Sequence, residues 1–596
     1  MGVPGLFRTI IQNYNKTYFW DDNFKIDYFY WDFNGIIYEL YNVIKSKYNS
    51  PSMTNSKFEN LLIKTIIEYV KDFLKRFKVN KELYIAIDGP PPRAKMVQQR
   101  WRRYKTEIEN KYKEAIYKDF GETKPKGWDT RRISPGTKFM DKLSTQLKKI
   151  INSNELVNYP GLKITLSDAS VPGEGEHKFI PIIRQSKYEK DDNIVILSKD
   201  ADLLILALTT QTPNLFILRP LIDEDYLQKY LEIGYVYVNI DEYINAFTTE
   251  LGFNPKSKLE RFRYIYDYIF LASLGGNDFI IPAKFLKIKS GGLDILLKTY
   301  KKIAATQQNF LILYNPQNKN KSTVKPRINT YFFKELIREL ASMEQYQMKN
   351  LRTKQVKQSS RLSNNTKLKE QNKSELEVVI SRFDNLDFNS QYHPFREDFV
   401  STFKKVEYRE PMAAWKPNYY QHFFNIDTQN KQEFNEMRKL ISIKYLESLI
   451  FTIEYYLIGV PSWSFYYPFR NAPLLNDFYF NIKFMPDIND IFIPVGEPVK
   501  PFTQLMMIYP VQLKAELPIL YRPVMTDLKY GCVQFYPKDF ELDVLIGDKF
   551  IYSEPILPNI DQKKLVSVLK QLEDNLPAAD KKRNKITNDV LTVISK

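Results

Sequence analysis

The stretch LYIAIDGPPPRAKMVQQRWRR, residues 83–103, combines the two patterns that decide the fold. Its first five residues form a short apolar run of the kind found in buried strands. From Arg93 the chain continues without interruption to Phe120 and then meets Gly121, and a proline before a helix with a glycine just after it marks the helix ends. The stretch therefore predicts a buried strand followed by one long helix. We expect the charged far end of that helix to protrude.

The same alternation of strand and helix patterns continues through the first half of the chain. YFYW (28–31) and NIVILS (193–198) are further compact apolar runs bounded by polar residues, and they predict buried strands. Residues 57–77 and 139–152 have apolar side chains at helical spacing. Strands that alternate with helices indicate an α/β fold with a mainly parallel, twisted sheet flanked by helices.

Acidic residues follow each of the predicted strands. Asp32 comes directly after the first strand and Asp88 directly after LYIAI, while Asp200 and Asp202 come just after NIVILS. Asp278 follows an apolar, helix-like run in the segment GGNDF. In open parallel sheets, ligands bind outside the carboxyl ends of the strands. We therefore expect these acids to converge on one point.

The segment VPGEGEHK (171–178) adds two more carboxylates, Glu174 and Glu176. Residues two apart share a face on an extended segment, and the two glycines permit a tight turn and close approach of other groups. An isolated GEGE is more often a surface loop with two solvated acids. Because five aspartates also lie at the ends of predicted elements, the favoured interpretation is that Glu174 and Glu176 belong to one cluster with them.

A cluster of this kind calls for cations, because gathered carboxylates repel one another and take up protons. Carboxylate sites with room for water suit Mg²⁺ or Mn²⁺, and two such ions about 4 Å apart serve phosphodiester cleavage. For any single aspartate, capping of the next helix is the more frequent role. The predicted catalytic and metal-binding residues are Asp32, Asp88, Glu174, Glu176, Asp200, Asp202 and Asp278.

The predicted long helix carries a polar stripe beside Asp88. Lys95, Gln99, Arg102 and Arg103 lie at positions i, i+4, i+7 and i+8, which share one face. Three cations and an amide near a helix N-terminus form a binding site for a terminal phosphate. A solvated basic face is the alternative, and the neighbouring acid cluster favours the phosphate site.

Length and composition limit the class of protein. The chain has 596 residues, which suggests two or three domains, and a formal net charge of +17, which favours a polyanionic partner. Cys532 is the only cysteine, so multi-cysteine zinc modules are excluded and a reducing, intracellular compartment is expected. We find no signal peptide pattern and no apolar run of membrane-spanning length.

Composition also divides the second half. Residues from about 348 to 377 contain almost no large apolar side chains and predict a flexible basic linker, with a segment that becomes ordered around a partner as the alternative. A second folded region, rich in aromatic residues and proline, extends to about residue 578, and residues 579–596 are expected to be a frayed tail.

The motifs of both halves resemble the Xrn family of 5′→3′ exoribonucleases. The first half carries MGVPGLFR at the start of the chain, DFNG (32–35), IDGPPPRAKMVQQRWRR (87–103), SPGTKFM (134–140), VPGEGEHK, KDADLLIL (199–206) and GNDF (276–279). The second half carries GVPSWSFYYPFRNAP (459–473), KPFTQLM (500–506) and FYPKDFELD (535–543).

This resemblance implies a domain organisation. Residues 1–300 would be the catalytic domain, with a PIN/flap-nuclease-like core and its metal site at the carboxyl ends of the strands. Residues 301–385 would be a variable connecting segment. Residues 386–578 would be a second, mostly helical conserved region that packs on the catalytic domain and completes the active-site pocket. A compact form without the family's long C-terminal domains is expected.

The resemblance also implies roles for the residues singled out above. The seven acids would bind the metals, and the polar stripe would bind the 5′-phosphate, with Asn34 of DFNG as a further substrate contact. Tyr38 stands where the family usually has a histidine that stacks on the 5′ base. Trp463 is a further candidate for base stacking, although Phe465 replaces a second tryptophan of that segment and leaves the choice between the two open.

The implied activity is processive hydrolysis of 5′-monophosphorylated, single-stranded RNA to nucleoside 5′-monophosphates in mRNA decay. A cytoplasmic monomer that acts with decapping or other RNA-decay factors is expected, with the nucleus as the alternative compartment. Two other functions are weighed: a flap-type structure-specific DNA nuclease, and a catalytically inactive RNA-binding scaffold. The long helix and the aromatic second half argue against the first, and the complete set of acids argues against the second.

Overall fold

The computed structural model describes most of the chain. Its described residues are 7, 10–49, 53–153, 161–198, 201–221, 232–307, 309–314, 325–369, 374–385, 399–400, 411–543, 550 and 553–593. For residues 201, 202, 289, 352–369, 399–400 and 593 only the backbone is described.

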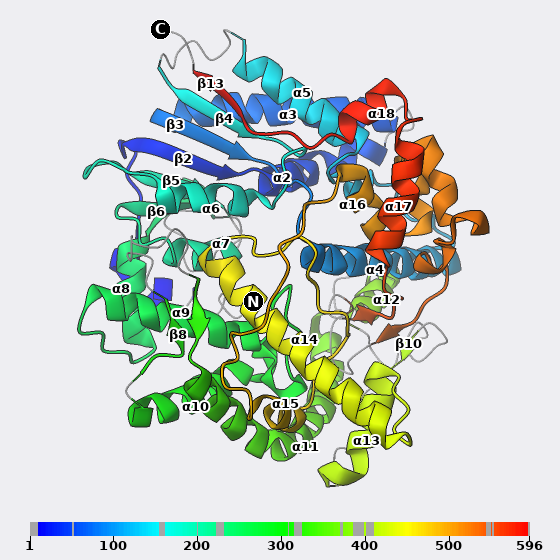
Figure 1. Cartoon of the computed structure of the whole chain (residues 1–596). Coiled ribbons are helices and arrows are strands. Elements are labelled where there is room, and N and C mark those ends of the chain that lie inside the picture. Colours follow the sequence, from blue (N-terminus) through cyan, green and yellow to red (C-terminus); the bar gives the residue numbers. More distant parts are fainter. Residues whose placement is uncertain are drawn as a thin grey trace.

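An eight-stranded sheet forms the centre of the first half, in the order β1-β7-β6-β5-β2-β3-β4-β13 (Figure 1). The five strands from β6 to β4 are parallel to their neighbours, whereas β7, β1 and β13 pair antiparallel. The strands are β1 (Tyr18–Phe19), β2 (Ile26–Asp32), β3 (Val79–Ala86), β4 (Lys163–Ser167), β5 (Ile194–Leu197), β6 (Leu215–Pro220), β7 (Tyr235–Asn239) and β13 (Val590–Val593). The predicted mainly parallel sheet is confirmed.

Helices cover both faces of this sheet because the central strands are apolar on both sides. Along β2, Phe29 and Trp31 pack into one core while Tyr30 packs into another, as expected for side chains that alternate across a strand. The first core is closed by α2 (Asn34–Ile44), α3 (Asn55–Arg76) and α5 (Lys138–Ile151). The second is closed by α6 (Gly175–Gln185), α7 (Ala201–Leu208), α8 (Ile240–Glu250) and α9 (Lys258–Leu274).

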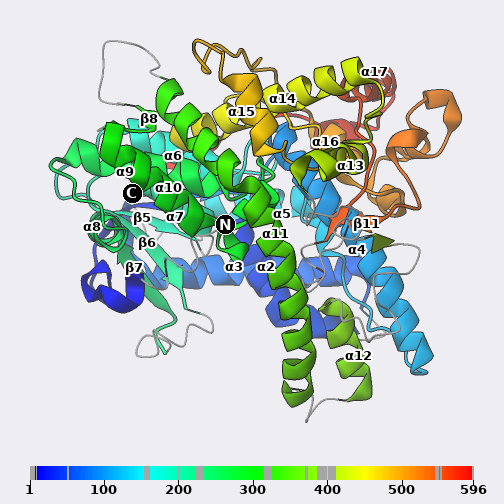
Figure 2. The same ribbon diagram turned by 90° about the horizontal axis from the view of Figure 1, so that it is seen from below.

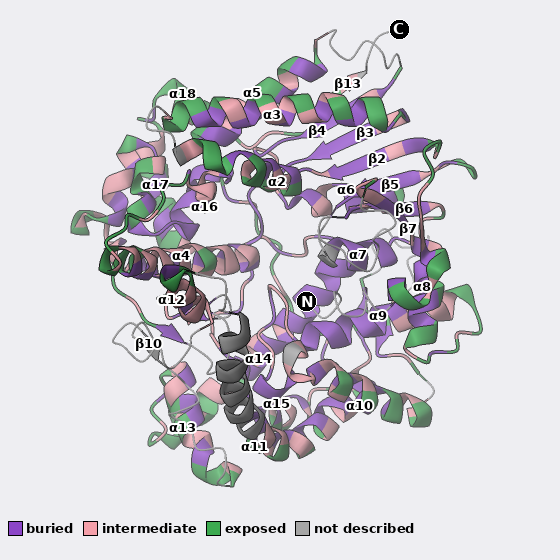
Figure 3. Ribbon diagram, turned by 180° about the vertical axis from the view of Figure 1, so that it is seen from behind, coloured by how far each residue is buried: buried purple, intermediate pink, exposed green. Residues whose placement is uncertain are grey.

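The second half of the chain is mostly helical and shares the second core. Its buried residues continue directly from those under the sheet, so the two conserved regions form one packed unit (Figure 3). The helices concerned are α10 (Gly292–Gln307), α11 (Thr330–Lys369), α13 (Met412–Phe424), α14 (Lys431–Leu457) and α15 (Leu475–Ile482). Short strand pairs accompany them: β8 (Ile312–Leu313) with β9 (Arg327–Ile328), and β10 (Phe399–Val400) with β11 (Leu542–Asp543) and β12 (Glu554–Pro555).

The long predicted helix is α4 (Arg93–Asp119), and it projects from the body beside α12 (Figure 2). Its far half is partly covered, because Ile108, Tyr112 and Ile116 pack against the apolar face of α12 (Glu375–Asp384). Its near half packs on α16 (Pro501–Ile508), which is followed by α17 (Gln562–Glu573) and α18 (Ala578–Arg583). The short 3₁₀ helices are Asn15–Thr17, Lys45–Asn49, Thr130–Arg132, Lys284–Leu286, Ile288–Ser290, Val511–Glu516, Ile519–Met525, Leu528–Tyr530 and Val533–Phe535.

Two expectations from composition are wrong. Residues 348–369 of the expected flexible linker belong to helix α11. The stretch contains neither proline nor glycine, and its Lys, Gln, Arg and Leu residues are good helix formers. Residues 370–373 of that segment lie outside the described residues. The expected frayed tail includes β13, whose Val590–Val593 pair with Leu166–Lys163 of β4. Apolar Val590, Leu591 and Val593 suit a strand, and their partner lies 424 residues away in sequence, where no local pattern points to it.

Within the described part of the chain, no helix has both the length and the apolar character needed to cross a membrane.

Candidate active site

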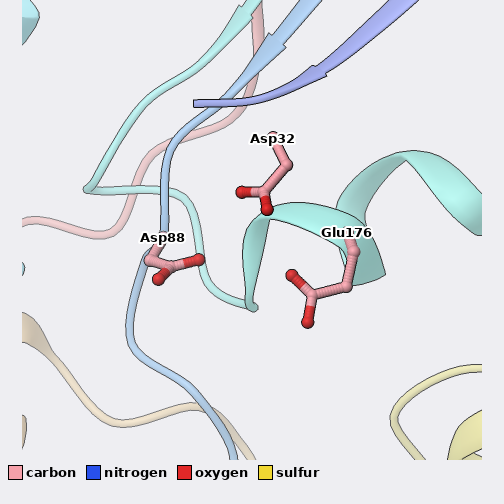
Figure 4. A group of neighbouring side chains, drawn as sticks. All are labelled: Asp32, Asp88 and Glu176. Carbon is pink, nitrogen blue, oxygen red and sulfur yellow. The ribbon is translucent and has the colours of Figure 1, made fainter. Parts of the chain in front are cut away.

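Three of the predicted acids meet at the carboxyl ends of the central strands. Asp32 is the last residue of β2, Asp88 lies two residues beyond β3, and Glu176 is in the first turn of α6. One carboxylate oxygen from each of the three lies within 4.8 Å of the others, and the side chains point toward a common centre (Figure 4). Parallel strands that end at one edge therefore bring together residues 56 to 144 positions apart, as the sequence predicts.

The glycines of VPGEGEHK allow this convergence. A Cβ on Gly175 would lie 3.0 Å from Asp32 Oδ1 and 3.3 Å from the carbonyl oxygen of Ala86, so a larger residue would crowd the acids. Gly173 has a φ of +109°, which L-residues rarely adopt, and its carbonyl accepts from Gly89 N at 2.8 Å. The loop is thus held against the segment that follows β3.

The carboxylate of Asp88 is fixed by two donors. Asn34 Nδ2 donates to Oδ2 at 2.6 Å, and the backbone N–H of Gly175 donates to Oδ1 at 2.7 Å. Asn34 Oδ1 in turn accepts from Asp88 N at 3.2 Å. Asn34, predicted as a substrate contact, is therefore placed here as the residue that orients Asp88.

The donor set suits a hard cation. Burial and the neighbouring carboxylates of Glu174, Asp32 and Asp88 raise the pKa of Glu176 well above its usual value. A divalent cation would remove this repulsion and keep the acids ionised, and carboxylate oxygens are the ligands that Mg²⁺ and Mn²⁺ prefer. The three residues of the cluster therefore fit a divalent metal.

Glu174 and Asp278 lie beside the cluster and pair with Lys95. Lys95 Nζ contacts Glu174 Oε2 and lies 2.7 Å from Asp278 Oδ2, and Gln98 Nε2 donates to Asp278 Oδ1 at 2.6 Å. Burial lowers the pKa of Lys95, but the carboxylates of Glu174 and Asp278 outweigh it and raise that pKa well above the usual value. The lysine of the predicted phosphate stripe is therefore a charged bridge between two predicted metal ligands.

The second half of the chain reaches this site through Tyr455 on α14. Its hydroxyl donates to Glu174 Oε1, and its ring lies 3.8 Å from the ring of His177 between centroids. Burial lowers the pKa of His177 well below its usual value, which keeps the imidazole neutral and suits a packing role. Tyr455 was not predicted, because nothing in its local sequence distinguishes it from the many other tyrosines of this chain.

Lys178 is a further residue that the sequence did not single out. Its Nζ donates to the carbonyls of Ile87 and Asp168, at 2.5 Å and 2.9 Å, and so joins the ends of β3 and β4. Burial lowers its pKa to about 8. Lys178 is the last residue of the quoted VPGEGEHK motif, and its place in that motif is the only feature of the sequence that points to it.

The acids and the polar stripe open into one cavity of about 930 Å³, which we call the carboxylate cavity. It is lined by both predicted groups and by Tyr38, whose side chain is 41% exposed. The lining residues that were predicted are Asp32, Asn34, Tyr38, Asp88, Lys95, Gln99, Arg102, Arg103, Glu174 and Glu176. The cations of the stripe and the acidic cluster therefore face the same space.

Residues from two other segments of the chain hold the stripe in place. Arg103 donates to Ser134 Oγ at 2.7 Å and to the Gln99 carbonyl at 3.2 Å, and its Nε is buried without a partner in the described structure. Gln504 Nε2 on α16 donates to Gln99 Oε1 at 3.3 Å. Arg102 is exposed at the cavity wall. Ser134 and Gln504 lie in the quoted motifs SPGTKFM and KPFTQLM, although the sequence alone gave neither a role.

The remaining predicted residues are not brought into this group. Asp200 lies outside the described residues, and only the backbone of Asp202, in the first turn of α7, is described. Trp463 does not belong to the described lining of the carboxylate cavity. Its backbone carbonyl accepts from Arg93 N at 3.1 Å, next to the start of α4, and Phe465 is buried against Phe451.

Two family models match the chain in order along its length. The model described as XRN 5'-3' exonuclease N-terminus matches residues 1–220, and the model described as Xrn1 helical domain matches residues 257–596. The first match contains the acid cluster and the stripe of α4, and the second contains Tyr455 and Gln504.

Curated relatives match over nearly the whole chain. A Debaryomyces hansenii protein named 5'-3' exoribonuclease 2 is 26% identical over 740 residues, which cover 100% of this chain and 72% of that protein. A human protein named 5'-3' exoribonuclease 1 is 28% identical over 632 residues, which cover 98% of this chain and 35% of that protein. A Saccharomyces cerevisiae protein of the same name is 26% identical, with 99% and 44% covered. Taken with the ordered family matches, these similarities show that the chain belongs to the XRN 5′–3′ exonuclease family.

Proposed function

We propose that the protein is a processive 5′→3′ exoribonuclease that hydrolyses 5′-monophosphorylated RNA to nucleoside 5′-monophosphates. The observation that carries the proposal is the shared cavity, in which an acidic cluster and a cationic stripe face the same space. The names of the relatives, 5'-3' exoribonuclease 1 and 2, support the 5′→3′ direction and RNA as the substrate.

In this proposal the stripe on α4 receives the terminal phosphate. Arg102 and Arg103 supply guanidinium donors that suit a phosphate, and Gln99 adds an amide. Ser134 and Gln504 keep Arg103 and Gln99 in place through the contacts described above. Since the stripe is a small set of donors against one wall, we expect it to accept one phosphate and to reject a triphosphate or a cap.

The acids take the scissile phosphodiester in the same cavity. We propose Asp32, Asp88 and Glu176 as ligands for divalent ions, with Glu174, Asp200, Asp202 and Asp278 as the rest of the metal-binding and catalytic set. Two Mg²⁺ or Mn²⁺ ions about 4 Å apart would supply an activated water and stabilise the leaving oxygen. Asn34 and the Gly175 N–H hold Asp88 in its orientation while the strand is bound.

Base stacking completes the proposed binding mode. Tyr38 lines the cavity and can stack on the first base, which contributes about 1–3 kcal/mol per base in single-strand binding. Trp463 is proposed for a base further along the strand, outside the described cavity wall. We further propose a monomer that acts in cytoplasmic mRNA decay on ends released by decapping, as the motif resemblance suggests.

The test compares one RNA sequence with 5′-monophosphate, 5′-triphosphate and 5′-hydroxyl ends, and a DNA of the same sequence. With Mg²⁺, the monophosphate RNA is expected to give mononucleotides without long-lived intermediates, and EDTA is expected to stop the reaction. Comparable degradation of the triphosphate RNA would contradict the proposal. So would cleavage confined to the junction of a flap DNA, which would favour the DNA-nuclease alternative.

A further inference from the structure

The face of helix α4 opposite the phosphate stripe also lines a cavity. Residues Arg93, Val97, Arg100 and Trp101 lie at i, i+4, i+7 and i+8 and point away from the carboxylate cavity, because 100° per residue places them on the other side of the helix. They form one wall of a separate cavity of about 630 Å³, which we call the arginine cavity. Its volume lies in the range of ligand pockets.

The other walls come from the second half of the chain and are aromatic. The partly buried rings among the described lining residues are Trp101, His422, Phe424, Tyr466 and Phe469. The segment 466–470 lies directly after SWSF, so it connects the arginine cavity to Trp463 beside the start of α4. Rings that keep part of their surface exposed are suited to stacking on a base.

The arginine cavity carries positive charge without acids. Its described lining includes Arg93, Arg100 and Arg470 and contains no Asp or Glu. Arg93 lies 3.7 Å above the Tyr466 ring and donates to the Ile560 carbonyl, while Arg100 donates to the carbonyls of Pro558 and Phe535, each at 2.6 Å. These two guanidinium groups are thus fixed by neutral carbonyls, and the carboxylate of Asp561, which does not line the cavity, acts on Arg93.

Arg470 and Lys284 add two cations that have no hydrogen-bond or ion-pair partner in the described structure. Arg470 makes no hydrogen bond or ion pair there, and its Nη1 is buried. Lys284 is 5% exposed and lies 4.8 Å from the centroid of Phe423, which lines the cavity. Burial and the nearby charges of Lys287 and Arg470 lower the pKa of Lys284 to about 8, against the opposing carboxylates of Glu554 and Asp543. Buried cations without partners are costly unless an anion joins them.

We propose that the arginine cavity is a second nucleotide-binding site, which takes one base on its aromatic walls and the adjoining phosphate at Arg470. The nucleotide comes either from the RNA strand or from free nucleoside monophosphate, since both carry the same chemistry. Binding of a nucleotide of the RNA strand rests on the proposed function, whereas binding of a free nucleoside monophosphate does not.

The test measures binding in EDTA, so that it does not depend on hydrolysis. The probes are AMP, UMP and a 12-nucleotide RNA with a 5′-monophosphate, and calorimetry gives affinity and stoichiometry. The key variant is Arg470→Gln, whose folding should be intact because the guanidinium has no partner to lose. Leu440→Glu is a second variant that places a carboxylate at the cavity wall, where the side chain is 43% exposed. Arg338→Gln, an exposed arginine of α11 that is paired with Glu335, is the matched control.

Loss of a charge-assisted phosphate contact should weaken binding about tenfold. If free mononucleotide is the ligand, Arg470→Gln and Leu440→Glu lose affinity for AMP or UMP. If the strand is the ligand, they lose affinity for the 12-nucleotide RNA alone, and a 4-thiouridine in that RNA cross-links to the peptide that contains Tyr466. Unchanged affinity of both variants for all three probes overturns the second site. Absence of nuclease activity in the unmodified protein would refute the proposed function. The binding measurement in EDTA would still test the arginine cavity, because it does not depend on hydrolysis.

Discussion

The hydroxyl of Tyr455, on helix α14, donates to Glu174 Oε1, on the loop that ends in the acid cluster. The two residues belong to different family models and are 281 positions apart. Lys95 holds the second oxygen of the same carboxylate, so both oxygens of Glu174 are occupied. The helical half of the chain therefore takes part in the geometry of the acids.

Replacement of Tyr455 by Phe should lower kcat about tenfold, because it removes a hydrogen bond to a charged group while the ring packing against His177 stays. The Mg²⁺ concentration for half-maximal activity should rise, since a loosened Glu174 disturbs the cluster. Metal binding is also measured without turnover, as the increase in melting temperature with added Mn²⁺. Tyr467→Phe is the matched control, because its buried hydroxyl donates to the Asn471 carbonyl away from the acids. Equal metal dependence of the two variants would contradict a positioning role for Tyr455.

Replacement of Glu176 by Gln should abolish turnover and leave RNA affinity within about threefold of the parent, because the acids serve the chemical step and the stripe serves binding. The isosteric amide keeps the fold and removes one charged metal ligand. Single-turnover rates and RNA binding in Mg²⁺ check both halves of this expectation. A variant with a near-normal rate would remove Glu176 from the metal site.

Replacement of Arg102 by Ala should narrow the preference for 5′-monophosphate over 5′-hydroxyl RNA about tenfold, as expected when a charge-assisted contact is lost. Arg102 is exposed at the cavity wall, so the change should not affect stability. The ratio of kcat/KM for the two substrates is the measurement. Lys118→Ala, an exposed cation at the far end of the same helix, controls for net charge. An unchanged ratio would exclude Arg102 from phosphate recognition.

Asp267 should make stability depend on pH. Its carboxylate is buried and accepts from Tyr300 Oη and from the N–H groups of Leu311 and Ile312. Burial outweighs these hydrogen bonds and raises its pKa to about 7, whereas an unfolded aspartate ionises near pH 4. Between these values the folded protein retains a proton that the unfolded chain releases. The free energy of unfolding therefore falls as pH rises, by up to about 1.4 kcal/mol per pH unit from this group.

Urea unfolding of Asp267→Asn and the parent from pH 4 to pH 7 tests this expectation. The parent should lose stability relative to the variant as pH rises, because the amide does not titrate. Asp294→Asn, a substitution at an exposed position of α10, is the control, and its free energy of unfolding should change with pH as that of the parent does. If the free energy of unfolding of Asp267→Asn also changed with pH in the same way as that of the parent, Asp267 would not hold a proton in the folded protein.

Deletion of residues 587–596 should lower the free energy of unfolding by several kcal/mol and reduce activity. The deletion removes β13 from the edge of β4, together with the hydrogen bond from Tyr84 Oη to Asp589 Oδ2 at 2.5 Å. It also removes the contact between Thr587 and Ser170, on the loop that leads to VPGEGEHK. Leu591→Ala is the control, because that side chain is 55% exposed and the strand pairing stays. Equal melting temperatures of the truncated chain and the 596-residue chain would contradict a stabilising role for β13.

Local sequence was sufficient for the parts of the fold that depend on local pattern. YFYW, LYIAI and NIVILS are strands because their apolar side chains suit burial on both faces, and α4 begins and ends where its proline and glycine predict. Convergence of Asp32 and Asp88 followed from one rule about parallel sheets, whereas Glu176 was added from the spacing and the glycines of its loop.

What could not be predicted depends on contacts between distant segments. The spacing of Lys95 fixed the helix face on which it lies, but its pairing with Glu174 and Asp278 depends on how α4 approaches the loop. Tyr455, Gln504 and β13 reach the catalytic half from hundreds of residues away. A lack of large apolar residues over 348–369 does not predict the helix found there, because helix propensity needs no apolar face.

The pairing of β13 with β4 also has a consequence for biosynthesis. Leu166 pairs with Val590, so a ribosome that adds about 5–20 residues per second needs roughly 20–85 s to deliver the partner strand. Throughout that interval the nascent chain exposes the open edge of β4, with unpaired backbone groups that can template pairing with another chain. Among the described strand pairs of this sheet, β13 is the partner that is synthesised longest after its neighbour, because β1 and β7 have the next largest separation in sequence.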